Sequence, residues 1–279
     1  MTTPQPTLSQ TTGAGLACAV IARATLRAHP EELAGLRNQL TLPSGVPIPA
    51  ALLKHSDEQT IAALAAVLRA MSSAGLDDRA CGDWTVLAAP RFLGRQALAH
   101  TLQRYAAEGA WGISPHVIPH RILHAVSGTI SLALQIHGPN FGVDGIPTSS
   151  AQLLTTALAT LSDGQVPGVW AVMTGWCPEP IPHHAATPAV NGQQRPALCG
   201  AVALALAPLR ADWQGWELRL LPPVISHGPG KSNGQARPLF SLESFLDART
   251  DDAPSAGAEW RLCWGGSLEL RDGRARPRQ

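Results

Sequence analysis

The sequence predicts an α/β fold, because strands and helices alternate with short turns in one stretch of the chain. A strand is expected at residues 141–146, a helix at 149–161 and a second strand at 168–174. A strand, a helix and a second strand in this order form a βαβ unit, whose two strands run parallel in one sheet. We therefore expect an α/β domain built on a sheet that is at least partly parallel.

A helix with clear start and stop signals precedes this unit. Ser56 and Gln59 predict a capping box, in which two side chains satisfy free N–H groups at the helix start. Apolar side chains then recur at helical spacing as far as Met71, and Gly75 ends the run. We expect an amphipathic helix here, after a first buried strand at residues 16–21.

The remaining elements are expected from apolar runs between turns. The segment 119–136 is apolar on most sides, which predicts one buried helix. Further helices are expected at residues 96–108 and 241–246, and further strands at 84–88, 198–207, 218–224 and 260–270.

Composition and charge argue against several classes of function. The formal net charge is +1, which favours neither nucleic acid nor an anionic membrane as a partner. Only 15% of the residues are charged, so we expect a partner to cover part of the surface. The five cysteines include no C-x-x-C pair, which argues for reduced thiols in the cytoplasm. No apolar run reaches the length of a membrane span.

An ordered series of motifs carries a family resemblance. A Ser-Pro and an Ile-Pro pair open a helix, a Gly-Pro-Asn follows it, the next helix starts with small residues, and a strand then runs into a small-residue turn before a glutamate. These motifs are Ser114-Pro115, Ile118-Pro119, Gly138-Pro139-Asn140, Ser149, Ala151, Gly164, Gly175 and Glu179. The chain thus resembles the N-terminal half of β-ketoacyl synthases of the thiolase superfamily. The resemblance implies a single thiolase-like domain with α-β-α layers.

The resemblance extends more weakly to the helix at 57–75 and the strand at 200–203. The expected segments are a disordered N-terminus (1–14), a ketosynthase-like domain (15–207) with a Pro-rich loop (178–197), a divergent β-containing extension packed on it (208–270) and a basic tail (271–279).

The main departure from the family lies at the catalytic position. The family's cysteine lies seven residues after the Asn of Gly-Pro-Asn, at a strand-to-helix elbow; counted from Asn140, this position is Pro147. The elbow presents a thiol at a helix N-terminus, where the helix dipole lowers the pKa of the thiol, and the nucleophile's own N–H helps to form the oxyanion hole. Proline supplies neither group, although its fixed φ suits a helix start. The resemblance therefore implies that the fold is kept and the catalysis is lost.

A disarmed family member has an expected role in assembly, because ketosynthases are dimers across the elbow strand. The elbow and interface candidates are Asn140, Phe141, Val143, Pro147, Ser149 and Ser150. The chain is similar to the short chain-length-factor-like subunits of bacterial aryl-polyene and related type II fatty-acid and polyketide clusters. This implies a cytoplasmic heterodimer with an active β-ketoacyl synthase, access to acyl carrier protein through the complex, and no cofactor or metal.

The C-terminal part is expected to lack the catalytic histidines of complete ketosynthases. About 80 residues follow Ala201, which is too few for the second half that supplies these histidines in the family. His227 lies in a Ser-His-Gly-Pro-Gly sequence, which we interpret as a turn rather than the family's histidine motif.

One catalytic alternative and one scaffold alternative remain open. Ser149, Ser150 or Cys177 would accept an acyl group if the chain were an active acyltransferase, although no triad partner is evident. A scaffold that only docks acyl carrier protein is disfavoured by the weak net charge.

Three histidines form a possible metal-binding pattern. His116, His120 and His124 recur every four residues, as ligands on one helical face do. The neighbouring prolines place the first of them before the helix, so we expect buried or interfacial histidines rather than a zinc site.

Overall fold

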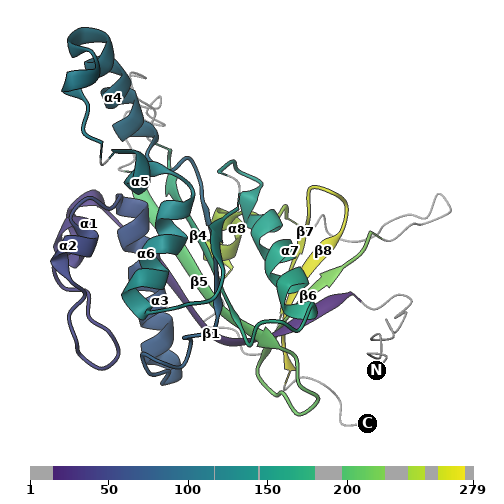
Figure 1. The fold of residues 1–279 in the computed structure, drawn as a ribbon. Helices are drawn as coiled ribbons and strands as arrows, with labels where there is room; N and C mark the ends of the chain where they lie inside the picture. The colour runs from purple at the N-terminus through teal and green to yellow at the C-terminus, as the bar shows by residue number, and fades with distance from the viewer. Residues whose placement is uncertain are drawn as a thin grey trace, which may run out of the picture.

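The computed structural model describes residues 15–115, 117–143, 145–179, 197–223, 238–248 and 257–273. Its centre is an eight-stranded sheet with the order β3-β2-β4-β5-β1-β6-β8-β7 (Figure 1). The strands are β1 (Leu16–Ala28), β2 (Thr85–Pro90), β3 (Asn140–Gly142), β4 (Val169–Cys177), β5 (Leu198–Pro208), β6 (Trp216–Leu221), β7 (Ala258–Arg261) and β8 (Ser267–Asp272). The helices are α1 (Pro30–Leu36), α2 (Ala50–Leu53), α3 (Glu58–Ala74), α4 (Arg95–Glu108), the 3₁₀ helix η1 (Ala110–Gly112), α5 (Val117–Arg121), α6 (His124–Leu134), α7 (Ser149–Ser162) and α8 (Leu242–Asp247).

The parallel part of the sheet lies at one edge. β2 pairs in parallel with β3 on one side and with β4 on the other. α7 connects β3 to β4, so the predicted βαβ unit is confirmed, with β2 between its two strands. The other strand pairs are antiparallel. Among the described strands, β3 therefore forms one edge of the sheet.

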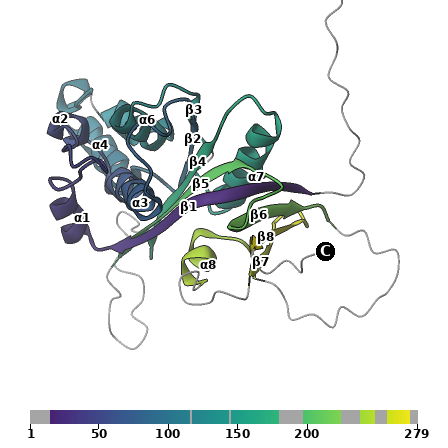
Figure 2. The ribbon, with the colours of Figure 1, turned by 90° about the horizontal axis from the view of Figure 1, so that it is seen from below.

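Helices cover both faces of the sheet (Figure 2). On one side α3 packs against β1, β4 and β5, together with α1 and α6. On the other side α7 and α8 pack against β4 and β5. Along β4, Trp170 and Val172 belong to the first core, whereas Ala171 and Met173 belong to the second, as a pleated strand between two layers requires. The expected α-β-α layering is confirmed.

β1 contributes to both cores because a bulge reverses its side chains. The register shifts between Val20 and Ala22. Val20 lies in the core under α7, and Ala22 lies in the core under α3. One extra residue in a strand exchanges the faces of all the residues that follow it. The strand predicted at residues 16–21 thus continues to Ala28.

The predicted helix after residue 56 is confirmed, but its cap was wrong. The N-cap is Asp57, whose carboxylate accepts a hydrogen bond from the N–H of Gln59 (2.9 Å). Ser56 lies one residue earlier and donates its hydroxyl to the carbonyl of Leu52 (3.3 Å). The helix ends as predicted at Gly75, whose φ of +64° is a conformation that glycine adopts without strain.

Two predicted elements are divided in the structure. The single helix expected at 119–136 is two helices, α5 and α6, separated at Ile122 and Leu123. The strand expected at 260–270 is a hairpin of β7 and β8, because Gly265, with a φ of +95°, lies in a turn between them. A Gly-Gly pair is a turn signal, and the prediction missed it.

The C-terminal strands continue the same sheet. β6 pairs with β1, and β8 and β7 follow outward. Residues 1–14, 180–196 and 274–279, which include most of the predicted Pro-rich loop and basic tail, lie outside the described residues, as does His227. No helix in the described part of the chain is long and apolar enough to cross a bilayer.

Candidate functional site at the end of β3

The elbow strand is shorter than predicted. β3 ends at Gly142, although a strand was expected to reach Ile146. The N–H of Val143 still donates to the carbonyl of Ala88 (2.7 Å), which extends the pairing with β2 by one bond. The carbonyl of Gly145 accepts a hydrogen bond from the N–H of Phe92 (2.9 Å), in the loop that follows β2.

Pro147 lies in an exposed turn directly before α7. A proline at this position has no N–H to donate and no side-chain nucleophile. Thr148 follows as the N-cap, and Ser149 is the first helical residue. The residue predicted to stand at the family's nucleophile position therefore lies at the start of a helix.

The hydroxyl of Ser149 is engaged by the same turn. Its Oγ accepts a hydrogen bond from the N–H of Ile146 (2.8 Å) and donates one to the carbonyl of Ile146 (2.5 Å). Ser149 and Ser150 are both buried. A nucleophilic serine needs a base that takes its proton. The proton of Ser149 points instead at a backbone carbonyl, so this side chain stabilises the elbow.

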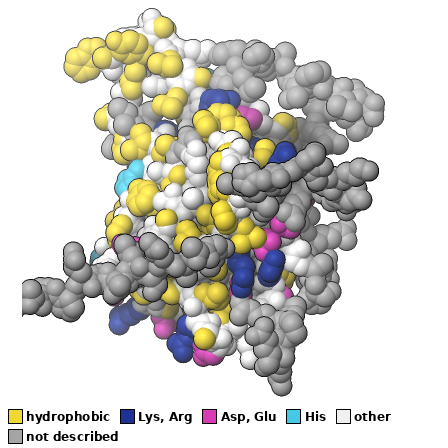
Figure 3. Space-filling view, turned by 90° about the vertical axis from the view of Figure 1, so that its right-hand side faces the viewer, with side chains coloured by type: hydrophobic (Ala, Val, Ile, Leu, Met, Phe, Trp, Pro, Cys, Tyr) yellow, Lys and Arg dark blue, Asp and Glu magenta, His cyan; other side chains and the backbone are white. Residues whose placement is uncertain are grey.

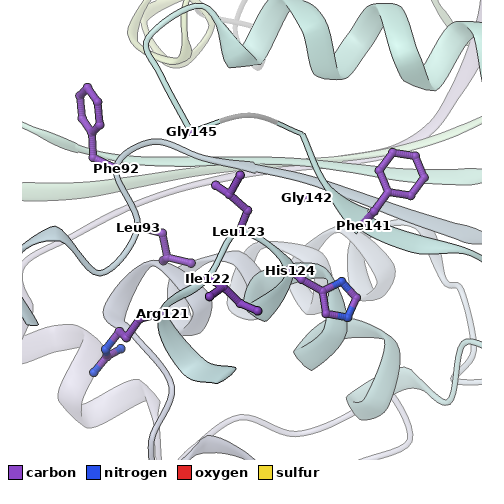
Figure 4. A pocket seen from close by; sticks show the side chains of 9 residues that line it. All are labelled: Phe92, Leu93, Arg121, Ile122, Leu123, His124, Phe141, Gly142 and Gly145. Carbon is purple, nitrogen blue, oxygen red and sulfur yellow. The ribbon is translucent and has the colours of Figure 1, made fainter. Parts of the chain in front are cut away.

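A hollow of about 660 Å³ opens beside the elbow strand. Its walls come from the loop after β2, the end of α5, the start of α6, and β3 with the residues that follow it. The lining residues are Phe92, Leu93, Arg121, Ile122, Leu123, His124, Phe141, Gly142 and Gly145. Figure 4 shows Phe92 and Phe141 on opposite sides, with Leu93, Ile122 and Leu123 between them. A mostly apolar hollow of this size is within the range of small-molecule pockets.

Glycine is required where the elbow passes the wall of this hollow. A Cβ on Gly142 would lie 2.5 Å from the carbonyl oxygen of Leu123, and a Cβ on Gly145 would lie 2.9 Å from the Cδ2 of Leu123. Neither distance is possible without movement of the backbone or of the leucine. The two glycines therefore allow the break between α5 and α6 to pack directly on β3.

A buried ion pair ties the hollow to the core. Arg121, at the end of α5, pairs with the carboxylate of Asp57 (3.0 Å), which also caps α3. Burial raises the pKa of Asp57, against the opposing effects of the Gln59 N–H and of the cations Arg121 and Arg37. The pair links the end of α5 to the N-cap of α3, directly before the break at Ile122 and Leu123.

A second set of charged side chains, Arg91, Glu179 and Glu243, lies where β2 and β4 end. Arg91 bonds the carboxylate of Glu243 and the carbonyl of Trp176. Burial raises the pKa of Glu179 to about 7, and the cations Arg91 and Arg95 oppose this increase without overcoming it. Arg91 is also paired with the carboxylate of Glu243, which partly offsets the effect of its positive charge on the pKa of Glu179.

The remaining predicted residues lie outside the elbow. Cys177 is exposed at the end of β4 and does not line the hollow. His120 lies on α5 with its ring 5.6 Å from that of His55, and His124 begins α6, so the helix break separates these two histidines. His116 lies outside the described residues. No group of three potential metal ligands occurs among the described residues.

Sequence reasoning identified the elbow but missed most of the hollow. Ile122 and Leu123 were placed inside one expected helix, and Phe92 and Leu93 were given no assignment. They come together only through the break after Arg121. The contact between β3 and the pair Ile122-Leu123 joins two separate segments of the chain, and the periodicity of apolar residues in the sequence does not indicate it.

The α-β-α layers, the parallel β3-β2-β4 edge and the elbow before α7 define a thiolase-like ketosynthase fold. The family model of the β-ketoacyl synthase N-terminal domain matches residues 43–189, which is more than half of the chain. The chain therefore belongs to this family. No curated protein matches it significantly.

Solved structures share the fold at low sequence identity. A β-ketoacyl synthase from Burkholderia phymatum STM815 is 13% identical with a TM-score of 0.52, over 70% of this chain and 59% of that chain. A chain in the complex of the ketosynthase ApeO with its chain length factor ApeC, from Xenorhabdus doucetiae, is 14% identical with a TM-score of 0.52, over 91% of this chain and 99% of that chain. The present chain thus spans 59% of the length of the first relative and nearly all of the second.

Proposed function

We propose that this chain is a non-catalytic, chain-length-factor-like subunit that pairs with an active β-ketoacyl synthase in type II fatty-acid or polyketide synthesis. The observation that carries the proposal is the elbow itself. Pro147 stands where the family has its nucleophile, and the neighbouring Ser149 hydroxyl is bonded to the backbone of Ile146. The elbow keeps its shape and lacks the group that would be acylated.

The expected partner is an active ketosynthase that meets the open edge of β3. The carbonyl of Pro139 accepts a hydrogen bond from the N–H of Val86 in β2, and the N–H of Val143 donates one to Ala88 at the other end of the pairing. In a parallel strand these directions alternate, so the N–H and C=O groups of Asn140 and Gly142 face away from the sheet. Such free groups are a template for a strand of another chain. A solved ketosynthase in complex with its chain length factor shares the fold, which supports this arrangement.

The cellular location, the biosynthetic system and the role of acyl carrier protein are proposed from the resemblance to the family. We place the heterodimer in the cytoplasm, in an aryl-polyene-like system, where acyl carrier protein would reach the partner's active site through the complex. The hollow beside β3 would then be enclosed at the subunit boundary. In this arrangement the subunit shapes the space available to a growing chain and does no chemistry itself.

The absence of acylation is the first prediction. Incubation with acyl-thioesters and intact-mass measurement should show no stoichiometric adduct on the isolated chain. Pro147→Cys should restore no condensation, because a thiol alone does not supply the histidines on which the family depends. A stable adduct on Ser149, Ser150 or the exposed Cys177 would contradict the proposal and favour an acyltransferase.

A further inference from the structure

α4 projects from the body of the molecule. It forms the upper end of the view in Figure 1, and its main contacts are with η1, which follows it, and with the short helix α5. None of its residues with described side chains is buried. The 14-residue helix and η1 therefore form an arm, residues 95–112, that stands largely in solvent.

The arm carries an apolar stripe along one side. Leu98, Leu102 and Tyr105 follow at spacings of four and three residues, which places them on one face of a helix. Leu102 is 68% exposed, Tyr105 is 54% exposed, and Trp111 in η1 is fully exposed. Figure 3 shows hydrophobic side chains over this upper end of the molecule.

An uncovered arm of this kind is unfavourable in water. Isolated helices shorter than about 12–15 residues are marginally stable even in favourable sequences, and most helices in proteins depend on packing. Grouped exposed apolar side chains usually mark an interaction site. The stripe is therefore expected to be covered in the functional assembly.

We propose that the arm packs on the ketosynthase-fold partner subunit, beside the open edge of β3. This inference rests on the proposed function, since it names a second surface of the same heterodimer. The arm is rooted at Phe92 and Leu93, which line the same hollow as Phe141 of β3. A partner that pairs with β3 and covers the hollow would therefore lie next to the root of the arm.

The size of the interface supports the same occupant. A stable protein interface buries roughly 800 Å² on each partner. β3 has only three residues, so its edge cannot supply this area alone. Large aromatic side chains bury about 150–250 Å² each, so Tyr105 and Trp111 would add a substantial part of the area.

The charge of the arm favours a protein over a polyanion. Within α4, Arg104 is paired with Glu108 (3.3 Å), and the apolar stripe carries no charge. An acidic carrier protein or an anionic membrane would be expected to meet a cluster of basic side chains. An apolar, nearly neutral face suits the surface of a folded subunit.

The test compares two faces of the arm in the full-length chain. An active ketosynthase from the native host is co-expressed with the wild type, with Leu102→Glu and with Ala107→Glu. Leu102 lies on the stripe, whereas Ala107 is exposed on the opposite face. We expect Leu102→Glu to weaken the complex at least about tenfold, as loss of an interface anchor does, and Ala107→Glu to leave it unchanged. Circular dichroism and the Tm of the isolated chains should agree with the wild type, because both sites are exposed.

Photo-crosslinking identifies the occupant. With p-benzoylphenylalanine at position 102, the crosslink should map to the ketosynthase, and at position 107 it should not. A crosslink from position 102 to a second copy of this chain, or to its own residues 180–196, would overturn the inference. If the wild type and Leu102→Glu bind the ketosynthase equally well, the inference about the arm is refuted and the proposed function is not. A wild type that does not bind the ketosynthase would refute the proposed function together with the arm.

Discussion

Two opposing effects act on the pKa of Glu179: burial raises it, and the nearby guanidinium groups of Arg91 and Arg95 lower it. Burial has the larger effect. Its Oε2 atom is buried without a hydrogen-bond partner in the described structure. Its pKa is raised from 4.5 to about 7 in the folded chain. Between roughly pH 4.5 and 7, the carboxyl group is therefore protonated in the folded chain and ionised in the unfolded chain. The free energy of unfolding should therefore fall as the pH rises through this window.

Glu179→Gln should remove this loss of stability. At pH 8 the variant is expected to be more stable than the wild type, on the order of 1 kcal/mol after allowance for solvent screening. At pH 4, where the carboxyl group is protonated in both states, the two should agree. Urea unfolding at pH 4, 6 and 8 measures the difference, with the surface variant Glu108→Gln as control. A less stable Glu179→Gln at pH 8 would mean that Arg91 and Arg95 outweigh the burial.

Spacing in the sequence predicts the position of some residues of the elbow but not the role of others. Pro147 was assigned to the nucleophile position by counting from Asn140, and this assignment stays a prediction. The role of Ser149 could not be found in this way. Its two hydrogen bonds to Ile146 depend on how the chain turns, and a serine after a proline predicts a catalytic hydroxyl and a capping hydroxyl equally well.

The elbow works as an element because two glycines let it lie against the break between α5 and α6. Gly142→Ala should disturb this contact, since the added Cβ would meet the carbonyl of Leu123, which belongs to the backbone and cannot rotate away. We expect a loss of about 1–3 kcal/mol in the free energy of unfolding, as in other overpacked sites.

The control for this element is the same substitution in open space. A Cβ on Gly35, inside α1, would have no neighbouring atom within 4 Å. Gly35→Ala should be neutral or stabilising by up to about 1 kcal/mol, because alanine has the higher helix propensity. Chemical denaturation of both variants decides the matter, and equal stabilities would show that the elbow can relax around the added methyl group.

Elements defined by local signals were predicted better than elements defined by contacts. α3 and α7 begin and end near the predicted residues, because caps, glycines and periodicity are local. The prediction of one helix at 119–136 was wrong: the chain breaks just after Arg121, whose partner Asp57 lies far away in sequence. The helix at α4 was predicted, but Leu98, Leu102 and Tyr105 look the same in sequence whether they face a core or a partner.

At the scale of the molecule, the two edges of the described sheet differ in what surrounds them. β7 ends the sheet beside the hairpin turn at Gly265, whereas β3 ends it beside the hollow and the arm. Val143, just after β3, is partly buried against the core under α7. Val143→Asp would therefore be expected to destabilise the subunit itself, which makes it a poor probe of assembly. A better probe changes only the groups that face away from the sheet.

Asn140 offers that probe, because its N–H points toward the open edge and not toward β2. Asn140→Pro deletes this donor and leaves the pairing with β2 intact, since proline is tolerated on edge strands. Asn140→Ala keeps the donor and removes a side-chain oxygen that has no partner in the described structure, which should cost little. If a strand of the ketosynthase partner pairs with β3, Asn140→Pro should dissociate the co-expressed complex in size-exclusion chromatography while Asn140→Ala elutes with the wild-type complex. If Asn140→Pro stays assembled at all concentrations, the partner does not extend the sheet at this edge.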